Sequence, residues 1–101
     1  MRIMLTGGTG YIGSKLVNYF ESLDYVVANV GRTPHCNERV INYKFDDDIN
    51  LAIEEFLPDV FIYLASVFDN DNLDEIINVN ITKPLTVLDA LVDKNVRFVY
   101  I

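Results

Sequence analysis

Four of the first thirteen residues are glycines, and they lie between a short apolar run and a segment with helical periodicity. They belong to the stretch Thr6 to Gly13, which has the sequence TGGTGYIG. The run before it, Arg2 to Leu5, predicts a buried strand, and Tyr11 to Leu23 predicts an amphipathic helix. A glycine-rich turn at such a junction is typical of the phosphate-binding turn of a nucleotide-binding α/β fold.

The glycines fit two spacings, Gly8-x-Gly10-x-x-Gly13 and the wider Gly7-x-x-Gly10-x-x-Gly13, and an ordinary glycine-rich turn is the alternative. In both patterns the first glycine permits a tight turn with φ > 0, and the middle one leaves room for a pyrophosphate. The last glycine lets the helix pack close to the strand. The start of the helix then offers N–H groups and a partial positive charge to an anion.

Motif order and composition exclude several other classes. A P-loop needs Lys followed by Ser or Thr after its second glycine, whereas here Ser14 precedes Lys15. The net charge of −7 disfavours binding to nucleic acid and to anionic membranes. A single cysteine, Cys36, forms no disulfide framework or zinc site, and we expect no metal site. The chain begins at Met1 directly before a strand and has no apolar run long enough to span a membrane, so we expect a cytoplasmic protein.

Predicted strands and helices alternate along the chain. The strands are expected at Arg2–Thr6, Tyr25–Val30, Val40–Phe45, Val60–Leu64 and Arg97–Ile101, and the helices at Tyr11–Leu23, Ile49–Phe56 and Leu73–Asp93. This alternation predicts an α/β fold with a doubly wound, Rossmann-like parallel sheet in the order 3-2-1-4-5, truncated after about five strands. A ligand is expected where the strand order reverses, between the first and fourth strands.

Two of the helices carry finer expectations. In the first helix, the apolar residues near helical spacing are expected to face the sheet: Ile12, Leu16, Tyr19, Phe20 and Leu23. In the last helix, Pro84 lacks a backbone donor and is expected to kink the helix near Asn80.

Three stretches together resemble one family. The stretch Thr6 to Gly13 matches a phosphate loop, and Tyr63-Leu64-Ala65-Ser66 resembles a His-Leu-Ala-Ala signature with Tyr for His and Ser for the second Ala. Asn78 to Thr82, followed by Val87 to Ala90, resembles a helix that bears a characteristic Asn. The chain therefore resembles the N-terminal half of an extended short-chain dehydrogenase/reductase of the NAD(P)-dependent epimerase/dehydratase group.

The resemblance implies cofactor-binding roles for residues at matching positions. Gly7, Gly10 and Gly13 would shape the pyrophosphate site, and the N–H groups of Tyr11 and Ile12 would face the phosphates. Asp46 would lie near the adenine amino group, and the wall near the adenine and the nicotinamide ribose would be lined by Leu64, Ala65 and Ser66. Asn80 would belong to the active-site helix and its water network. Structural alternatives stay open: Asp46 could cap the next helix, Ser66 could be a packing residue, and Asn80 could satisfy carbonyls freed by Pro84.

Arg32 determines the expected cofactor. NAD-binding members of the family usually have an acidic residue at the end of the second strand, where this chain has Gly31 followed by Arg32. A guanidinium at this position could pair with a 2′-phosphate, so we expect NADP rather than NAD. The alternative is an ordinary exposed loop arginine.

The family's catalytic residues are absent from these 101 residues. Its chemistry uses a Tyr-x-x-x-Lys pair and a Ser or Thr after the fifth strand. Tyr11 and Lys15 have this spacing, but they open the first helix and are interpreted as a coincidence. We therefore expect residues 1–101 to be a dinucleotide-binding domain that is incomplete at its C-terminus, with no catalytic residue of its own.

Three functional hypotheses follow. In the first, the intact protein is an NAD(P)-dependent epimerase, dehydratase or reductase that acts on a nucleotide sugar. In the second, it is a non-catalytic, NADP-sensing module of the same fold. A fold-only fragment that binds nothing is the third alternative. The open edge expected at the last strand also predicts that the chain could assemble as a homo-oligomer.

Overall fold

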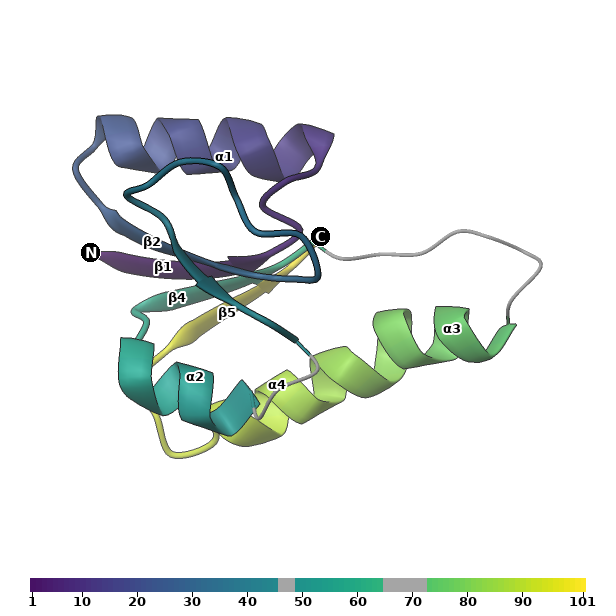
Figure 1. The fold of residues 1–101 in the computed structure, drawn as a ribbon. Helices are drawn as coiled ribbons and strands as arrows, with labels where there is room; N and C mark the ends of the chain where they lie inside the picture. Colours follow the sequence, from purple (N-terminus) through teal and green to yellow (C-terminus); the bar gives the residue numbers. More distant parts are fainter. Residues whose placement is uncertain (46–48, 65–72) are drawn as a thin grey trace.

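Five parallel strands form one sheet in the order β3-β2-β1-β4-β5, as predicted. The computed structural model describes residues 1–45, 49–64 and 73–101. The strands are β1 (Arg2–Thr6), β2 (Val26–Val30), β3 (Ile41–Tyr43), β4 (Val60–Tyr63) and β5 (Arg97–Tyr100), and the helices are α1 (Tyr11–Ser22), α2 (Ile49–Phe56), α3 (Leu73–Ile77), a π-helical turn (Asn78–Thr82) and α4 (Lys83–Leu91). Figure 1 shows α1 on one face of the sheet and α2 and α4 on the other.

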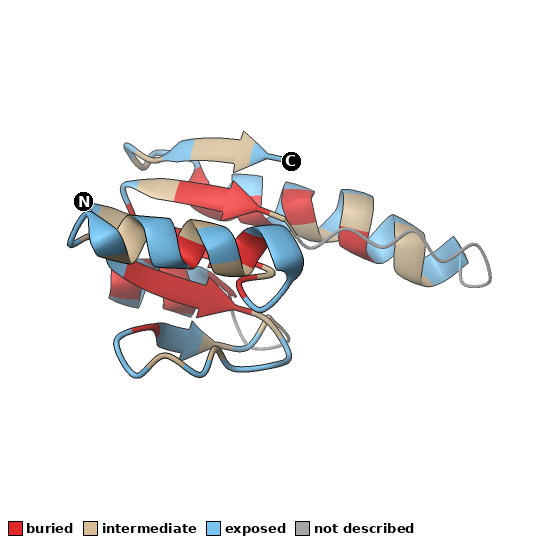
Figure 2. Cartoon of the chain, turned by 90° about the horizontal axis from the view of Figure 1, so that it is seen from above, coloured by how far each residue is buried: buried red, intermediate tan, exposed pale blue. Residues whose placement is uncertain are grey.

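The central strands are buried on both faces, which explains their almost continuous apolar sequences (Figure 2). Because side chains alternate along a strand, Ile3 points to one face and Met4 to the other. The face of the sheet that α2 and α4 cover holds the larger core: Met4, Ala28, Val30, Ile49, Ala52, Ile53, Phe56, Phe61, Tyr63, Val87, Ala90 and Leu91. The α1 face holds a smaller one: Ile3, Leu5, Val17, Val27, Val40 and Ile62.

Helix α1 does not bury the face expected from its large apolar residues. Its buried residues are Gly13 and Val17, with Phe20 partly buried against the α1-face core. Ile12, Tyr19 and Leu23 are instead 55%, 59% and 43% exposed, so this expectation was wrong for them. Leu16 is half-buried. The helix approaches the sheet through small side chains, and large residues at the same contact would hold it too far away.

The last helical segment is irregular around Asn80, where Pro84 was expected to disturb it. Residues Asn78–Thr82 form a π-helical turn, and the Lys83 N–H donates to the Asn78 carbonyl five residues earlier. Pro84 has no N–H, so it cannot donate a hydrogen bond to the Val79 carbonyl five residues earlier, as in a π-helix, or to the Asn80 carbonyl four residues earlier, as in an α-helix.

Two tyrosines supply the missing donors. The hydroxyl of Tyr63, on β4, donates to the Val79 carbonyl. The hydroxyl of Tyr100, on β5, donates to the Asn80 carbonyl over 3.0 Å. The two rings stack in parallel, with centroids 5.5 Å apart. The ends of neighbouring strands therefore hold the π-helical turn through its backbone.

Candidate functional site

The glycine turn between β1 and α1 adopts the conformation that its sequence requires. Gly7 has φ 70°, a left-handed value that is costly for residues with a Cβ. The Gly10 N–H donates to the Gly7 carbonyl over 3.0 Å and closes the turn. The first helical hydrogen bond is donated by Ser14 to the Gly10 carbonyl over 2.9 Å. The N–H groups of Tyr11 and Ile12 therefore precede the helix's own hydrogen-bond ladder, as at any helix N-terminus.

Two further glycines allow close approaches. A Cβ on Gly13 would lie 1.9 Å from the Gly7 carbonyl oxygen, so the helix contacts the turn through bare backbone. A Cβ on Gly8 would lie 2.5 Å from Oδ1 of Asn29, because the Gly8 N–H donates to that oxygen over 2.8 Å. Gly7 and Gly13 therefore fit the wider of the two spacings, while Gly8 is required by a contact with β2.

The ends of β1 and β4 meet where the strand order reverses. Thr6, the last residue of β1, is fully buried, and its Oγ1 accepts a hydrogen bond of 2.8 Å from the Leu64 N–H. This bond fixes the chain as it leaves β4 beside the glycine turn. Leu64 itself packs against the α1-face core.

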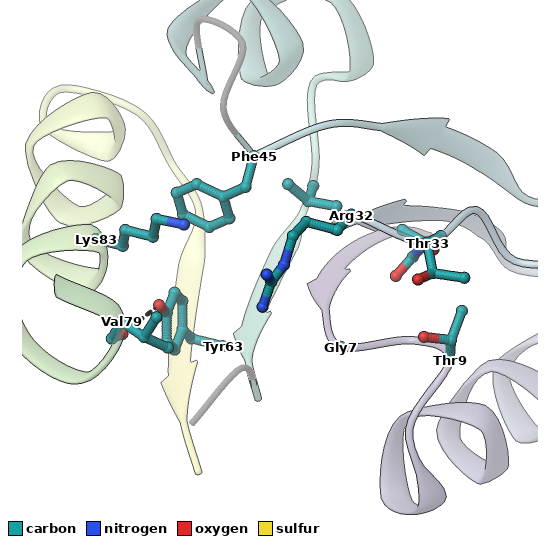
Figure 3. Close-up of a pocket in the computed structure, with 11 residues that line it drawn as sticks. Gly7, Thr9, Arg32, Thr33, Phe45, Tyr63, Val79 and Lys83 are labelled. Carbon is teal, nitrogen blue, oxygen red and sulfur yellow. Dashed lines mark hydrogen bonds between the residues drawn. The ribbon is translucent and has the colours of Figure 1, made fainter. Parts of the chain in front are cut away.

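A cavity of about 250 Å³ opens at the carboxyl ends of the strands (Figure 3). Its lining comes from the glycine turn, the end of β2 and its loop, the end of β3, β4, the π-helical turn and α4: Gly7, Thr9, Asn29, Val30, Gly31, Arg32, Thr33, Phe45, Tyr63, Val79 and Lys83. Segments far apart in sequence therefore share one cavity at the switch point, which is where doubly wound sheets bind ligands.

Two cations and an aromatic ring lie along this cavity. Nζ of Lys83 lies 4.8 Å from the centroid of the Phe45 ring, in cation–π geometry. The side chain of Arg32 is 82% exposed, and its Nη2 lies 3.8 Å from Oε1 of Glu75 on α3. An exposed pair at this distance is weak, so Arg32 can exchange it for an anionic ligand. The lining thus offers positive charge and a ring face to a phosphorylated aromatic compound.

Tyr63 forms the cavity wall opposite the glycine turn. Burial raises the pKa of its hydroxyl well above the ordinary value, and the charge that Tyr100 would carry when ionised raises it further. The hydroxyl therefore stays protonated near neutral pH and remains a donor to the Val79 carbonyl. This tyrosine supports the wall rather than exchanging protons.

The residues predicted from the sequence fall into three groups. Gly7 and Arg32 line the cavity, as does Thr9 of the glycine turn. The second group does not line it: Gly10, Tyr11, Ile12, Gly13 and Leu64. Tyr11 is 81% exposed at the start of α1, where Nζ of Lys15 lies 5.0 Å from its ring centroid. Asn80 is half-buried in the π-helical turn, and Val79 rather than Asn80 lines the cavity.

The third group lies outside the described residues and comprises Asp46, Ala65 and Ser66. The binding roles assigned to all of these residues stay predictions.

Sequence reasoning missed several lining residues, chiefly Asn29, Phe45 and Lys83, and it gave Tyr63 no role beyond its place in the Tyr63–Ser66 signature. One signal was available for Asn29, since it is the single polar residue in an otherwise apolar β2. Phe45 and Lys83 carry no such signal, because only the fold brings the end of β3 beside the start of α4.

A parallel sheet of this order with a glycine turn at its switch point defines a Rossmann-type domain of the dinucleotide-binding class. Over residues 3–101 the sequence matches the NAD dependent epimerase/dehydratase family, and the chain belongs to that family. The family resemblance drawn from the glycine, Tyr63–Ser66 and Asn80 motifs is thereby confirmed.

Known proteins of this kind are similar along nearly the whole chain. A probable dTDP-glucose 4,6-dehydratase of Sinorhizobium fredii is 33% identical, over 89% of this chain and 31% of that protein. A UDP-glucose 4-epimerase of Thermotoga maritima, solved with UDP-glucose, superposes with a TM-score of 0.86 at 23% identity, over 99% of this chain and 37% of that one. The Bordetella bronchiseptica enzyme WbmH, solved with NAD+, gives 0.84 at 23% identity, over 98% and 38%.

The chain spans about a third of the length of these relatives. In residues 1–45, 49–64 and 73–101, no helix is long and apolar enough to cross a membrane. In the same ranges, no group of three or more His, Cys, Asp or Glu side chains is arranged to hold a metal ion.

Proposed function

We propose that this chain is the cofactor-binding part of an NAD(P)-dependent enzyme that interconverts or dehydrates nucleotide sugars. The observation that carries the proposal is the bare-backbone contact between Gly13 and Gly7. This contact holds the start of α1 against the glycine turn, and Gly7 of that turn lines the cavity. A helix N-terminus next to a glycine turn suits a pyrophosphate, because it presents backbone N–H groups and a partial positive charge to an anion.

The residues present fit a dinucleotide. The close backbone contact at Gly13 leaves no room for a Cβ there, and the N–H groups of Tyr11 and Ile12 precede the helical ladder. Phe45 offers a ring face and Arg32 a cation at the same cavity. When bound, the nicotinamide ring supplies hydride transfer. The part of this chain is to hold the phosphates and orient the cofactor.

The nucleotide-sugar substrate is proposed from the relatives. The printed names of the relatives include a dTDP-glucose dehydratase and a UDP-glucose epimerase, and further structures of similar fold were solved with UDP and NAD or with UDP-glucose and NAD. These names do not favour a non-catalytic sensing module. Self-association stays a prediction.

We further propose that the cofactor is NADP. Arg32 follows β2, where a 2′-phosphate would lie, and its weak pair with Glu75 leaves the guanidinium available. Lys83 adds a second cation to the cavity. A charge-assisted hydrogen bond to phosphate contributes about 1.5–3 kcal/mol, enough to select NADP by roughly tenfold or more.

Calorimetric titration with NADP+ and NAD+ tests both parts of the proposal. We expect NADP+ to bind more tightly, and Arg32→Gln to weaken NADP+ about tenfold while leaving NAD+ within twofold. Arg39→Gln is the matched control, because Arg39 is an exposed loop arginine paired at 3.9 Å with Asp24 outside the cavity. Equal affinity of the unaltered protein for both dinucleotides would refute the NADP preference. If neither NADP+ nor NAD+ binds, the cofactor site itself is refuted.

A further inference from the structure

Asn29 is a buried polar residue in the middle of the sheet. It lies on β2 between Leu5 on β1 and Asn42 on β3, and it is 1% exposed. Its neighbours along the strand, Ala28 and Val30, are fully buried and apolar. A carboxamide in such surroundings is costly unless its donors and acceptor are paired, so its retention needs a reason.

The Asn29 carboxamide connects three segments at the end of the sheet. Its Oδ1 accepts a hydrogen bond of 2.8 Å from the Gly8 N–H in the glycine turn. Its Nδ2 donates to the Thr33 carbonyl over 3.3 Å and to Oδ1 of Asn42 over 3.4 Å. The partners fix the orientation of the amide, since the Gly8 N–H can only donate and the Thr33 carbonyl can only accept.

A second asparagine extends the connection into the loop after β2. Oδ1 of Asn42 accepts a hydrogen bond of 2.8 Å from the His35 N–H, and its Nδ2 donates to the His35 carbonyl over 3.4 Å. The Gly31 N–H donates to the Tyr43 carbonyl over 3.0 Å. The loop that carries Arg32 is thus held on both sides of that residue, and one of its anchors is Asn29.

We propose that Asn29 is a positioning residue that couples the phosphate-binding turn to the loop presenting Arg32. This proposal rests on the proposed function, because the two coupled segments would hold the pyrophosphate and the 2′-phosphate of one dinucleotide. The Gly8 N–H is directed inward to Asn29, which fixes the path of the turn beside the cavity. The Thr33 carbonyl is held by the same side chain, which fixes the backbone next to Arg32.

Two substitutions separate the functions of the carboxamide. Asn29→Asp keeps an acceptor for the Gly8 N–H but places oxygen against the Thr33 carbonyl and Oδ1 of Asn42. Asn29→Ala removes all three hydrogen bonds. Asn42→Ala is the matched control, because it releases the His35 N–H and one acceptor of Asn29 Nδ2 but leaves the bonds of Asn29 to Gly8 and Thr33 in place.

Amide hydrogen exchange of the ligand-free protein tests the coupling directly. We expect faster exchange at Gly8 and His35 in Asn29→Ala, at His35 alone in Asn29→Asp, and at His35 alone in Asn42→Ala. Unchanged exchange at either Gly8 or His35 in a folded Asn29→Ala would overturn the proposal. If Asn29→Ala does not fold, Asn29→Asp decides it, since unchanged exchange at His35 there contradicts the coupling.

Binding of NADP+ and NAD+ tests the positioning role. We expect both dissociation constants to rise at least tenfold in Asn29→Ala, and the preference for NADP+ to fall in Asn29→Asp. A purely structural residue would lower the melting temperature of Asn29→Asp without changing the ratio of its two affinities, and that result overturns the role. If the unaltered protein binds neither dinucleotide, the proposed function fails, and the exchange experiment still decides whether the two segments are coupled.

Discussion

Replacing Gly13 by alanine should destabilise the domain through a single methyl group. The added Cβ would lie 1.9 Å from the Gly7 carbonyl oxygen, 2.7 Å from its carbon and 2.9 Å from the Gly8 Cα. All three are backbone atoms of a turn already fixed by the Gly10 N–H, so they cannot move independently. Helix α1 must therefore retreat by about 1.5 Å to restore an ordinary contact of 3.4 Å.

The magnitude follows from two opposing effects. Overpacking of this kind costs up to about 3 kcal/mol, and more where the neighbour is rigid. Alanine is a better helix former than glycine by about 1 kcal/mol, which offsets part of the strain. We expect a net loss of about 2 kcal/mol in the free energy of unfolding. For a domain of this size, that corresponds to a fall of roughly 10 °C in melting temperature.

Urea unfolding followed by circular dichroism measures this loss as a shift in midpoint at constant slope. Gly31→Ala is the matched control, since a Cβ there meets nothing within 4 Å and Gly31 is not among the residues with positive φ. It should change stability by no more than about 0.5 kcal/mol. If Gly13→Ala unfolds at the same midpoint as Gly31→Ala, the close contact between helix and turn does not exist as described.

The two tyrosines under the π-helical turn give the remaining predictions. Tyr63→Phe should cost about 1–3 kcal/mol in urea unfolding, because it leaves the Val79 carbonyl buried without its donor. Tyr100→Phe should cost only about 1 kcal/mol, because Tyr100 is 49% exposed and water can reach its acceptor; a larger loss than in Tyr63→Phe would contradict this. Burial raises the pKa of Tyr63, so its contribution to stability is complete below the ordinary value of 10.0 and is lost as pH rises above it. The stability of Tyr63→Phe should therefore decline less steeply than that of the unaltered protein above about pH 10.

Most of the fold could be predicted from the sequence, because its signals are local and mutually consistent. Apolar runs such as Val26–Val30 mark strands buried on both faces, and their alternation with helices leaves few topologies. The face of α1 could not be predicted by counting large residues. Gly13 and Val17 share one helical face and Ile12 and Tyr19 share another, and the close approach of Gly13 to the glycine turn selects the face with the smaller pair.

The candidate site was predictable only where its chemistry is local. The turn around Gly7 has its sequence signature because backbone conformation dictates residue type. Two of the three partners of Asn29 lie 21 residues before it and 13 residues after it, so no local pattern contains them. The same holds for Phe45 and Lys83, which meet only when β3 and α4 take their places around the sheet.

The stacked tyrosines also imply an order of assembly. The cavity wall formed by Val79 and Lys83 belongs to a helix whose two freed carbonyls depend on hydroxyls from β4 and β5. Strand β5 follows that helix in the chain. A polypeptide synthesised from its N-terminus therefore contains Val79 and Lys83 before it contains Tyr100, one of the two tyrosines whose hydroxyls hold the helix. The glycine turn can form once β1 and α1 have met, whereas the opposite side of the cavity matures only when Tyr100 stacks on Tyr63.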